Sequence, residues 1–227
     1  MRDIRFWRIV VACIEATLPR YDFGSEVVGL LTPWLLRRMA VGLGTGSKAL
    51  DVGVGTGALS KQLLKRYRYV IGLDASFKMA REALRRLGGE RFDAVVGLAE
   101  EMPLREECVD AAYMAFTYRD LIDHGKALAE IRRALVRGGT LVSADIGRPR
   151  GPAAVLPYVA TRFLARVLGG FMSLGIGFNP WRALYATYLR LHDNGRVVEL
   201  ARLILGYARI IEILGGSLYV LVAHRTR

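Results

Sequence analysis

Two glycine-rich strings lie eleven residues apart in this sequence, at 42–46 and at 53–57. Only the second follows an apolar run of strand length and opens a segment with a helical pattern. In that setting, glycines let a ligand lie against the backbone, and the start of the helix offers free N–H groups. We therefore predict that Gly53, Gly55 and Gly57 bind a ligand, and that the first string only ends a helix.

Two carboxylates flank the second glycine string. Asp74 ends the next apolar run, 21 residues after Gly53, where a carboxylate can accept both hydroxyls of a ribose. Asp51 stands two residues before Gly53, where an acid is unfavourable beside a pyrophosphate but suits a ligand with a cationic amino group. The two acids predict an adenosine ligand, and they favour S-adenosylmethionine over NAD.

Short apolar runs alternate with helix-patterned segments through the middle of the chain. The expected strands cover 48–53, 69–74, 93–97, 109–116 and 139–146, and the expected helices cover 57–66, 76–88 and 123–136. Strict alternation predicts right-handed crossovers. The expected fold is therefore of the α/β class, a doubly wound, Rossmann-like and mostly parallel sheet with helices on both faces.

We expect the whole chain, 1–227, to form a single domain with four parts. Residues 1–47 give N-terminal helices, including one helix over 25–41, and residues 48–147 give the cofactor-binding α/β core. An apolar helical stretch at 148–191 forms a lid. Residues 192–227 add a helix and a β-hairpin that places an antiparallel strand in the sheet.

The 227 residues hold 33 Lys and Arg against 21 Asp and Glu, a net charge of +12, with a mean hydropathy of +0.25. A chain that is both basic and apolar favours an anionic membrane surface at least as much as nucleic acid. Two cysteines exclude a disulfide framework, and three scattered histidines form no metal-binding pattern. We therefore expect no metal and a cytoplasmic location.

No run of about 18 uncharged apolar residues occurs, so we expect no transmembrane anchor. The nearest approach, 152–178, is interrupted by Arg162 and Arg166. These arginines could reach lipid head groups while the apolar side chains meet the interface, which would attach the protein to the inner face of the membrane. Burial of the same stretch within the molecule, or against a second copy in a homodimer, is an equal alternative.

Five segments carry a resemblance to a known family. They are Tyr21-Asp22 with Ser25, Ala99-Glu100-Glu101-Met102-Pro103-Leu104, Phe116-Thr117-Tyr118-Arg119-Asp120, Ala127-Leu128-Ala129-Glu130, and Gly138-Gly139. In order and spacing they resemble the UbiE/MenG family of class I S-adenosylmethionine-dependent C-methyltransferases. Members of that family methylate a ring carbon of ubiquinone and menaquinone precursors.

On the cofactor side, the resemblance implies S-adenosyl-L-methionine as the cofactor. Tyr21 would close over its methionine end, and Ala75, Ala99, Glu100 and Phe116 would line its site.

On the acceptor side, the resemblance implies a small hydrophobic molecule, a prenylated quinol, under the helical lid. Arg119 and Asp120 would polarise a water or a phenolate there, and Asp145 is a second candidate for this role. These three are the expected catalytic residues.

Three departures from the family pattern leave the acceptor open. Leu98 stands where a polar residue is usual, Asp120 where Asn is usual, and Asp145 where Glu is usual. O- or N-methylation of another small amphipathic molecule therefore stays open, as does a non-catalytic subunit that binds an adenosine ligand. Nucleic acid is not expected as a partner, because the segment at 116–118 lacks the clamp used on flipped amino-bearing bases.

Overall fold

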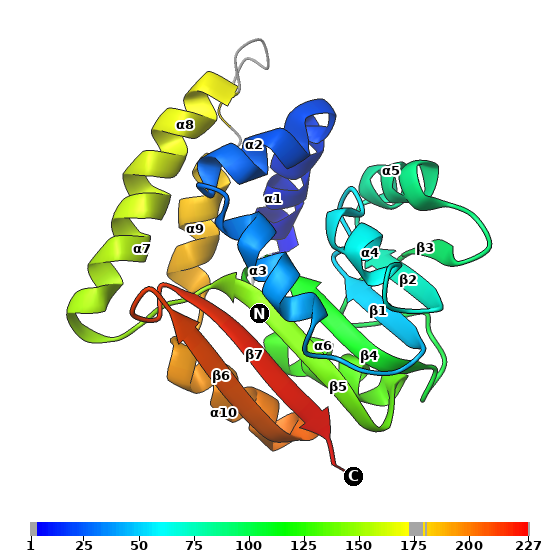
Figure 1. Cartoon of the computed structure of the whole chain (residues 1–227). Helices are drawn as coiled ribbons and strands as arrows, with labels where there is room; N and C mark the ends of the chain where they lie inside the picture. Colours follow the sequence, from blue (N-terminus) through cyan, green and yellow to red (C-terminus); the bar gives the residue numbers. More distant parts are fainter. Residues whose placement is uncertain (1–3, 173–178, 180, 227) are drawn as a thin grey trace.

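The computed structural model describes residues 4–172, 179 and 181–226 of the chain. Its centre is a seven-stranded sheet with the order β3-β2-β1-β4-β5-β7-β6 (Figure 1). The strands are β1 (Lys48–Val52), β2 (Tyr69–Asp74), β3 (Phe92–Val96), β4 (Val109–Ala115), β5 (Leu135–Ile146), β6 (Gly206–Ile213) and β7 (Leu218–Arg225). The pairings from β3 to β5 are parallel, whereas β7 is antiparallel to β5 and β6. This arrangement confirms the expected fold class.

The strand order reverses between β1 and β4. From β1 the sheet extends through β2 to β3 on one side, and through β4 to β5 on the other. Sheets of this kind have a crevice outside the carboxyl ends of their strands at the reversal, and ligands bind there. The expected glycine loop follows β1 at this point, so the fold places it where a ligand site is expected.

Helices pack on both faces of the sheet and create two apolar cores. The helices that do so are α3 (Thr32–Val41), α4 (Ala58–Leu63), α5 (Phe77–Leu87), α6 (His124–Ala134) and α10 (Asn194–Leu205). Leu36 of α3 and Leu63 of α4 belong to one core, whereas Ile131 of α6 and Val197 of α10 belong to the other.

Three of these helices begin at a side-chain cap. Ser76 accepts a hydrogen bond from the backbone of the third residue of α5, and Asp123 and Asp193 do the same for α6 and α10. A polar side chain at this position satisfies an N–H group that has no partner inside the helix. The caps therefore fix where each helix starts after its strand or loop.

The N-terminal part forms three helices, α1 (Ile4–Ala16), α2 (Tyr21–Val28) and α3. The expected continuous helix over 25–41 is wrong, because the chain turns at Leu30 and Leu31, whose φ angles are 50° and 64°. Pro33 gives the physical reason. In a continuous helix its ring would clash with the carbonyl of Gly29, and it has no N–H to donate.

Residues 151–172 form one long helical stretch along the side of the molecule (Figure 1). Its parts are a 3-10 turn (Gly151–Ala154), α7 (Val155–Val159), a π-helical turn (Ala160–Leu164) and α8 (Ala165–Met172), and α9 (Arg182–Arg190) packs against it. Residues 173–178 of the expected lid lie outside the described residues.

The stretch Gly151–Phe171 is long and apolar enough, by length and composition, to cross a membrane. Length and composition therefore do not exclude a span, contrary to what Arg162 and Arg166 led us to expect. Core helices of proteins outside membranes can have the same length and composition. Only 22% of its most apolar 18-residue segment is buried, so this helix does not belong to the core.

The first glycine string ends a helix, as the sequence predicted. Gly42 is the C-cap of α3. Gly44 passes over a buried pair of tyrosines, and a Cβ atom there would lie 2.3 Å from the hydroxyl oxygen of Tyr113 and 2.8 Å from that of Tyr67. These two hydroxyls are hydrogen-bonded to each other at 2.7 Å, so neither can easily move away.

We expect Gly44→Ala to destabilise the fold by about 1–3 kcal/mol, because overpacking a filled site has this cost. Gly42→Ala is the matched control, since a Cβ there meets nothing closer than the Met39 carbonyl oxygen at 3.7 Å. Urea unfolding of both variants measures the difference. Equal loss of stability in the two variants would contradict the packing role of Gly44.

Candidate active site

A cavity opens at the carboxyl ends of β1, β2 and β4, with a volume of about 120 Å³. We call it the glycine-loop cavity. The structure brings many of the expected site residues together in its wall: Tyr21, Gly53, Gly55, Asp74, Ala75, Ala99, Glu100, Phe116 and Asp120. Residues from five separate stretches of the sequence therefore converge on one hollow at the carboxyl edge of the sheet.

The glycine loop takes a backbone shape that few other residues adopt. Gly53, Gly55 and Gly57 have φ angles of 75°, 54° and 88°. A Cβ atom at Gly53 would lie 2.3 Å from the Thr117 hydroxyl oxygen, whereas one at Gly55 would meet nothing within 4 Å. Since Gly55 lines the cavity, the space beside its backbone is free for a ligand.

Gly57 differs from the direct contact that we expected. It is the N-cap of α4 and does not belong to the described cavity wall. A Cβ atom at this position would lie 2.6 Å from Leu87 of α5. A glycine is therefore required at position 57 for the turn and for close packing of α4 and α5, outside the cavity wall.

Asp74 is fixed at the end of β2 by two backbone groups. One carboxylate oxygen accepts a hydrogen bond from the Gly55 N–H at 2.9 Å, and the other accepts one from the Ser76 N–H at 2.8 Å. Burial raises the pKa of this carboxyl, although the two hydrogen bonds act to lower it. Each carboxylate oxygen can accept a second hydrogen bond, so Asp74 keeps capacity for ligand hydroxyls.

Asp51 also lies behind the cavity wall, which differs from the expected contact with a ligand amino group. It is 1% exposed, and it accepts a hydrogen bond from the Ser60 hydroxyl of α4 at 2.7 Å. Burial raises its pKa to about 7, because a buried carboxylate loses its hydration. A cation bound beyond the loop would favour its charged form through the electric field, without touching it.

The N-terminal helices close the glycine-loop cavity from above. Trp7, Val11 and Ile14 of α1 belong to its wall. The sequence predicted helices in this part of the chain, but it did not indicate which surface their apolar faces would cover. We call residues 4–28 the N-terminal roof.

Polar contacts tie the roof to the rest of the molecule. Glu15 accepts a hydrogen bond from the Ser76 hydroxyl at 2.6 Å and pairs with Lys78 at 2.9 Å. Asp22 accepts hydrogen bonds from the Thr56 hydroxyl of the glycine loop and from the Arg86 guanidinium of α5. The roof is thus attached directly to the loop that it covers.

A second and larger cavity, of about 250 Å³, adjoins the first. We call it the apolar cavity, because α2, α3, α7 and α8 contribute mostly apolar side chains to it. Tyr21, Ala115 and Phe116 line both cavities. The ring of Tyr21 stacks on that of Trp181, with 6.3 Å between the ring centres, and this contact holds Tyr21 at the shared wall.

Arg119 and Asp120 lie at the junction of the two cavities. Arg119 lines the apolar cavity, and Asp120 lines the glycine-loop cavity. Burial raises the pKa of Asp120 to about 6, even though the positive charge of Arg119 opposes the rise. Asp120 is therefore mostly a carboxylate at pH 7, but one that holds a proton far more readily than an exposed aspartate does.

Asp145 does not reach either cavity, although we expected it to face the acceptor. Its side chain has no exposed surface and accepts a hydrogen bond from the Arg119 guanidinium at 2.7 Å. It also accepts one from the Ile146 N–H at 2.8 Å. Burial alone would lower the pKa of Arg119, but the carboxylates of Asp145 and Asp120 hold it above its usual value. Asp145 therefore positions Arg119.

His192 lies between α9 and α10, away from both cavities. Its ring packs 4.6 Å from that of His124, which packs 4.4 Å from that of Tyr118. None of these rings belongs to the described walls of the two cavities. Within the described ranges, no group of three or more His, Cys, Asp or Glu could hold a metal ion.

Comparison with known proteins gives this geometry a family. A model described as a methyltransferase domain matches residues 50–143. A demethylmenaquinone methyltransferase of Thermobifida fusca is 31% identical over 182 residues, which cover 78% of this chain and 72% of that protein. The chain belongs to the demethylmenaquinone methyltransferase family. It is an S-adenosylmethionine-dependent methyltransferase.

A second relative agrees with this family, and a solved structure shares the fold. A ubiquinone/menaquinone biosynthesis C-methyltransferase, UbiE, of Syntrophotalea carbinolica is 30% identical over 168 residues, with 70% of this chain and 71% of that protein covered. A SAM-dependent methyltransferase of Thermotoga maritima has the same fold, with a TM-score of 0.70 at 20% identity over 97% of this chain and 99% of that one.

The glycine-loop cavity fits the family's cofactor. Gly55 leaves open space beside its backbone, and Asp74 keeps free acceptor positions at the same wall. We expect Asp74→Asn to weaken S-adenosylmethionine binding by about 1.5–3 kcal/mol, the scale of a hydrogen bond to a charged group. Titration calorimetry measures this change.

Asp93→Asn, at an exposed carboxylate on the neighbouring strand, is the control and should leave the affinity unchanged. Full affinity in the Asp74 variant would show that another group holds the ribose. Tight binding of NAD by the native protein, with no response to S-adenosylmethionine, would contradict the cofactor assignment.

Proposed function

We propose that this enzyme methylates a ring carbon of a reduced quinone precursor of the demethylmenaquinol type, in menaquinone biosynthesis. One observation carries the proposal: an apolar cavity large enough to hold a ring shares a wall with the cofactor cavity and presents a buried guanidinium beside it. The names of the relatives support the same acceptor, since they describe demethylmenaquinone methyltransferases.

The residues of the glycine-loop cavity would hold the cofactor. Asp74 would take the ribose hydroxyls, and the backbone at Ala99 and Glu100 would meet the adenine. The side chain of Glu100 is already engaged, because it accepts hydrogen bonds from the backbone of Ile122 and Asp123 at 2.8 and 3.0 Å. When bound, S-adenosylmethionine supplies an electrophilic methyl group.

The protein's own part in the reaction is to place and activate the acceptor. A ring carbon becomes nucleophilic when a neighbouring hydroxyl loses its proton. Asp120 would accept that proton, directly or through a water, because its pKa of about 6 leaves it ionised at neutral pH. Arg119 would stabilise the resulting phenolate, and Asp145 holds Arg119 in place. Once the ring carbon carries the methyl group, it would lose its own hydrogen as a proton to water, and the neighbouring oxygen would regain a proton, which makes the ring aromatic again.

The two cavities also orient the reaction. Tyr21 and Phe116 line both of them, so the reacting carbon and the methyl group would meet across a narrow and largely apolar wall. Holding two reactants in line in a dry site supplies much of the rate of a simple displacement.

A labelled methyl group locates the product. The protein is incubated with isotopically labelled S-adenosylmethionine and a reduced short-chain demethylmenaquinone, and the product is characterised by NMR. Label on a ring carbon is the expected result. Label on an oxygen would contradict carbon methylation, and absence of any labelled product would contradict the proposed acceptor.

We expect Arg119→Ala to lower kcat by about 10²-fold or more, the range found for positioned acid–base groups. The cofactor dissociation constant should change little, because Arg119 does not line the described wall of the glycine-loop cavity. Since the variant leaves Asp145 buried without its cation, Arg119→Lys provides a second variant that keeps the charge. Its kcat should fall less.

The measurements are single-turnover kinetics and cofactor calorimetry on both variants, with thermal unfolding as the check on folding. Full turnover in Arg119→Lys and Arg119→Ala, or a loss of cofactor affinity equal to the loss of activity, would make Arg119 a structural residue.

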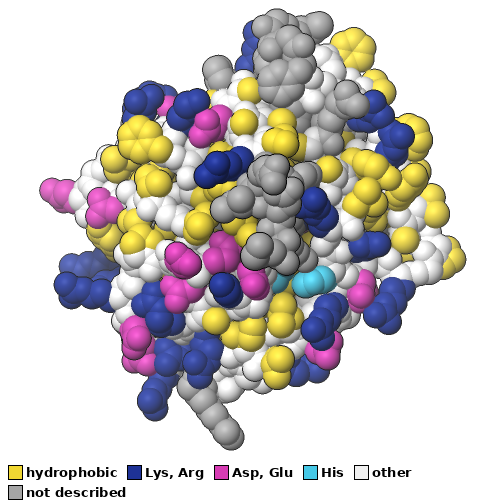
Figure 2. All heavy atoms as spheres, turned by 180° about the vertical axis from the view of Figure 1, so that it is seen from behind, with side chains coloured by type: hydrophobic (Ala, Val, Ile, Leu, Met, Phe, Trp, Pro, Cys, Tyr) yellow, Lys and Arg dark blue, Asp and Glu magenta, His cyan; other side chains and the backbone are white. Residues whose placement is uncertain are grey.

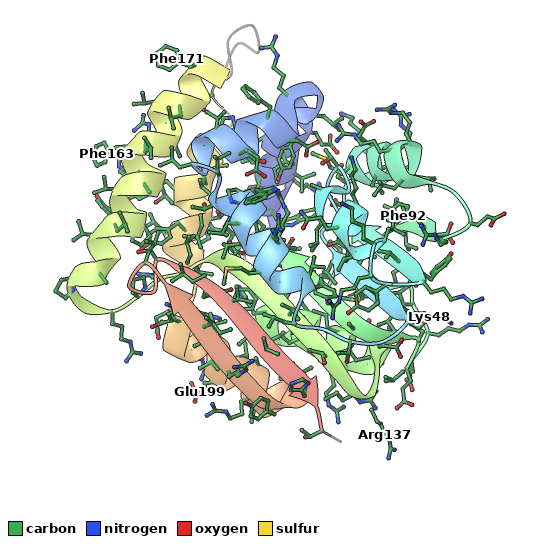
Figure 3. All side chains as sticks on the ribbon, in the orientation of Figure 1. Lys48, Phe92, Arg137, Phe163, Phe171 and Glu199 are labelled. Atoms are coloured by element: carbon green, nitrogen blue, oxygen red, sulfur yellow. The ribbon has the colours of Figure 1, made fainter. Side chains whose placement is uncertain are left out.

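We also propose that the enzyme works in the cytoplasm and binds the inner face of the membrane through the helical stretch 151–172. Its outer face carries a row of apolar side chains that are 44% to 67% exposed: Val155, Leu156, Val159, Phe163, Val167 and Phe171. Phe163 and Phe171 project away from the molecule in Figure 3.

The charge and position of this face support a lipid partner. Arg162 and Arg166 lie among the apolar residues, and basic and apolar side chains alternate along this flank in the rear view (Figure 2). Exposed Leu30, Leu156 and Leu214 also line the apolar cavity, so the cavity opens towards the same surface. A prenylated acceptor could therefore pass from lipid into the cavity without crossing water.

We expect the protein to co-sediment with phosphatidylglycerol vesicles, and less with phosphatidylcholine vesicles, because the basic residues favour anionic lipid. The double variant Phe163→Asp/Val167→Asp should lose most of this binding. Leu203→Asp is the matched control, because Leu203 is 79% exposed but lies on α10. Failure of the native protein to bind anionic vesicles, or dissociation of a dimer by the double variant, would contradict a lipid partner.

A further inference from the structure

The charged residues in the described wall of the apolar cavity are all positive, and the reaction outlined above uses only one of them. Within the described wall, both charged side chains are arginines, Arg37 and Arg119, and no carboxylate belongs to it. The two come from different parts of the fold, since Arg37 lies on α3 and Arg119 follows β4. An otherwise apolar hollow thus presents two fixed cations.

Arg37 is as enclosed as Arg119. Each of the two side chains is 12% exposed. The Arg37 guanidinium donates a hydrogen bond to Glu26 of α2 at 2.5 Å, and the other carboxylate oxygen of Glu26 accepts the Trp34 N–H at 3.0 Å. Glu26 therefore fixes the guanidinium and the first turn of α3 together, from outside the cavity wall.

The two guanidinium groups approach one aromatic ring at the shared wall. The central carbon of Arg37 lies 6.0 Å from the centre of the Phe116 ring, and that of Arg119 lies 5.6 Å from it. Phe116 borders the glycine-loop cavity as well. A ring that enters the apolar cavity far enough to reach the cofactor would therefore lie close to both guanidinium groups.

We propose that Arg37 is a specificity-determining residue that binds the second ring oxygen of the acceptor, while Arg119 binds the oxygen next to the carbon that is methylated. This inference rests on the proposed function. A reduced quinone carries two oxygens on opposite sides of one ring, and both become electron-rich as the ring is activated. Buried polar sites discriminate strongly against an analogue that lacks the matching group, because their own groups are then left without a partner.

The neighbouring residue supplies a matched control. Arg38 lies on the same helix but is exposed, and its guanidinium packs 5.4 Å from the Trp34 ring. It does not belong to the described wall of the apolar cavity. A change at Arg38 alters net charge and helix composition in the same way as a change at Arg37.

The experiment compares two acceptors in the native enzyme, Arg37→Gln and Arg38→Gln. One is a reduced short-chain demethylmenaquinone, for which KM and kcat are measured. The other is its analogue with a single ring hydroxyl, next to the methylated carbon, for which the inhibition constant against the first acceptor is measured. We expect Arg37→Gln to raise KM for the quinol about 10- to 100-fold and to leave the inhibition constant of the analogue unchanged. Arg38→Gln should resemble the native enzyme.

An equal rise in both constants, or no rise in KM, would overturn the role of Arg37 while leaving the proposed function intact. Absence of quinol methylation by the native enzyme would overturn the proposed function and this inference with it. Because Arg37→Gln leaves Glu26 without its cation, Arg37→Lys is measured as well, with cofactor affinity as the check on folding. Lysine keeps the ion pair but lacks the planar fork, so a smaller rise in KM, again for the quinol alone, is expected.

Discussion

The contact between Asp145 and Arg119 is the interaction on which the rest of the site depends. The Asp145 side chain has no exposed surface, and its partner guanidinium lies 2.7 Å away. A carboxylate buried in this way persists only beside a cation, and removing one member of such a pair typically costs about 3–5 kcal/mol. The pair joins the end of β5 to the turn after β4, so the sheet itself determines where the guanidinium stands. Arg119 in turn lies beside Asp120 and the ring of Phe116, which border the two cavities.

Much of the fold could be predicted because its signals are local. The apolar runs at 69–74 and 109–116 have the length and bounds of β2 and β4, and the two glycine strings differ in what precedes and follows them. The signal for the break between α2 and α3 was also local, because Pro33 forbids a continuous helix. Helical spacing of apolar residues on both sides of Pro33 concealed that signal.

Only those site residues that lie at the ends of strands could be predicted from the sequence. Asp74 ends β2 and Arg119 follows β4, and parallel strands bring these positions to one edge. The sequence does not indicate how deeply a side chain is buried. Asp51 and Asp145 were expected to form the cavity wall, but both lie behind it. The Phe116 φ angle of 61° also has no signal, because non-glycine residues rarely take this conformation and surrounding packing imposes it.

The attachment of the N-terminal roof has a consequence for the speed of ligand exchange. Among the described residues between 4 and 28, Val10 and Val28 are buried but none belongs to either apolar core. Glu15 and Asp22 connect the roof to α5 and the glycine loop through partly exposed charges. Dissolved salt screens such charges over about 8–10 Å, but it leaves apolar burial largely intact. Ionic strength therefore acts on the cover of the cavity more than on its floor. We therefore infer that the release of a bound molecule depends on ionic strength, although the groups that bind it are shielded from dissolved ions.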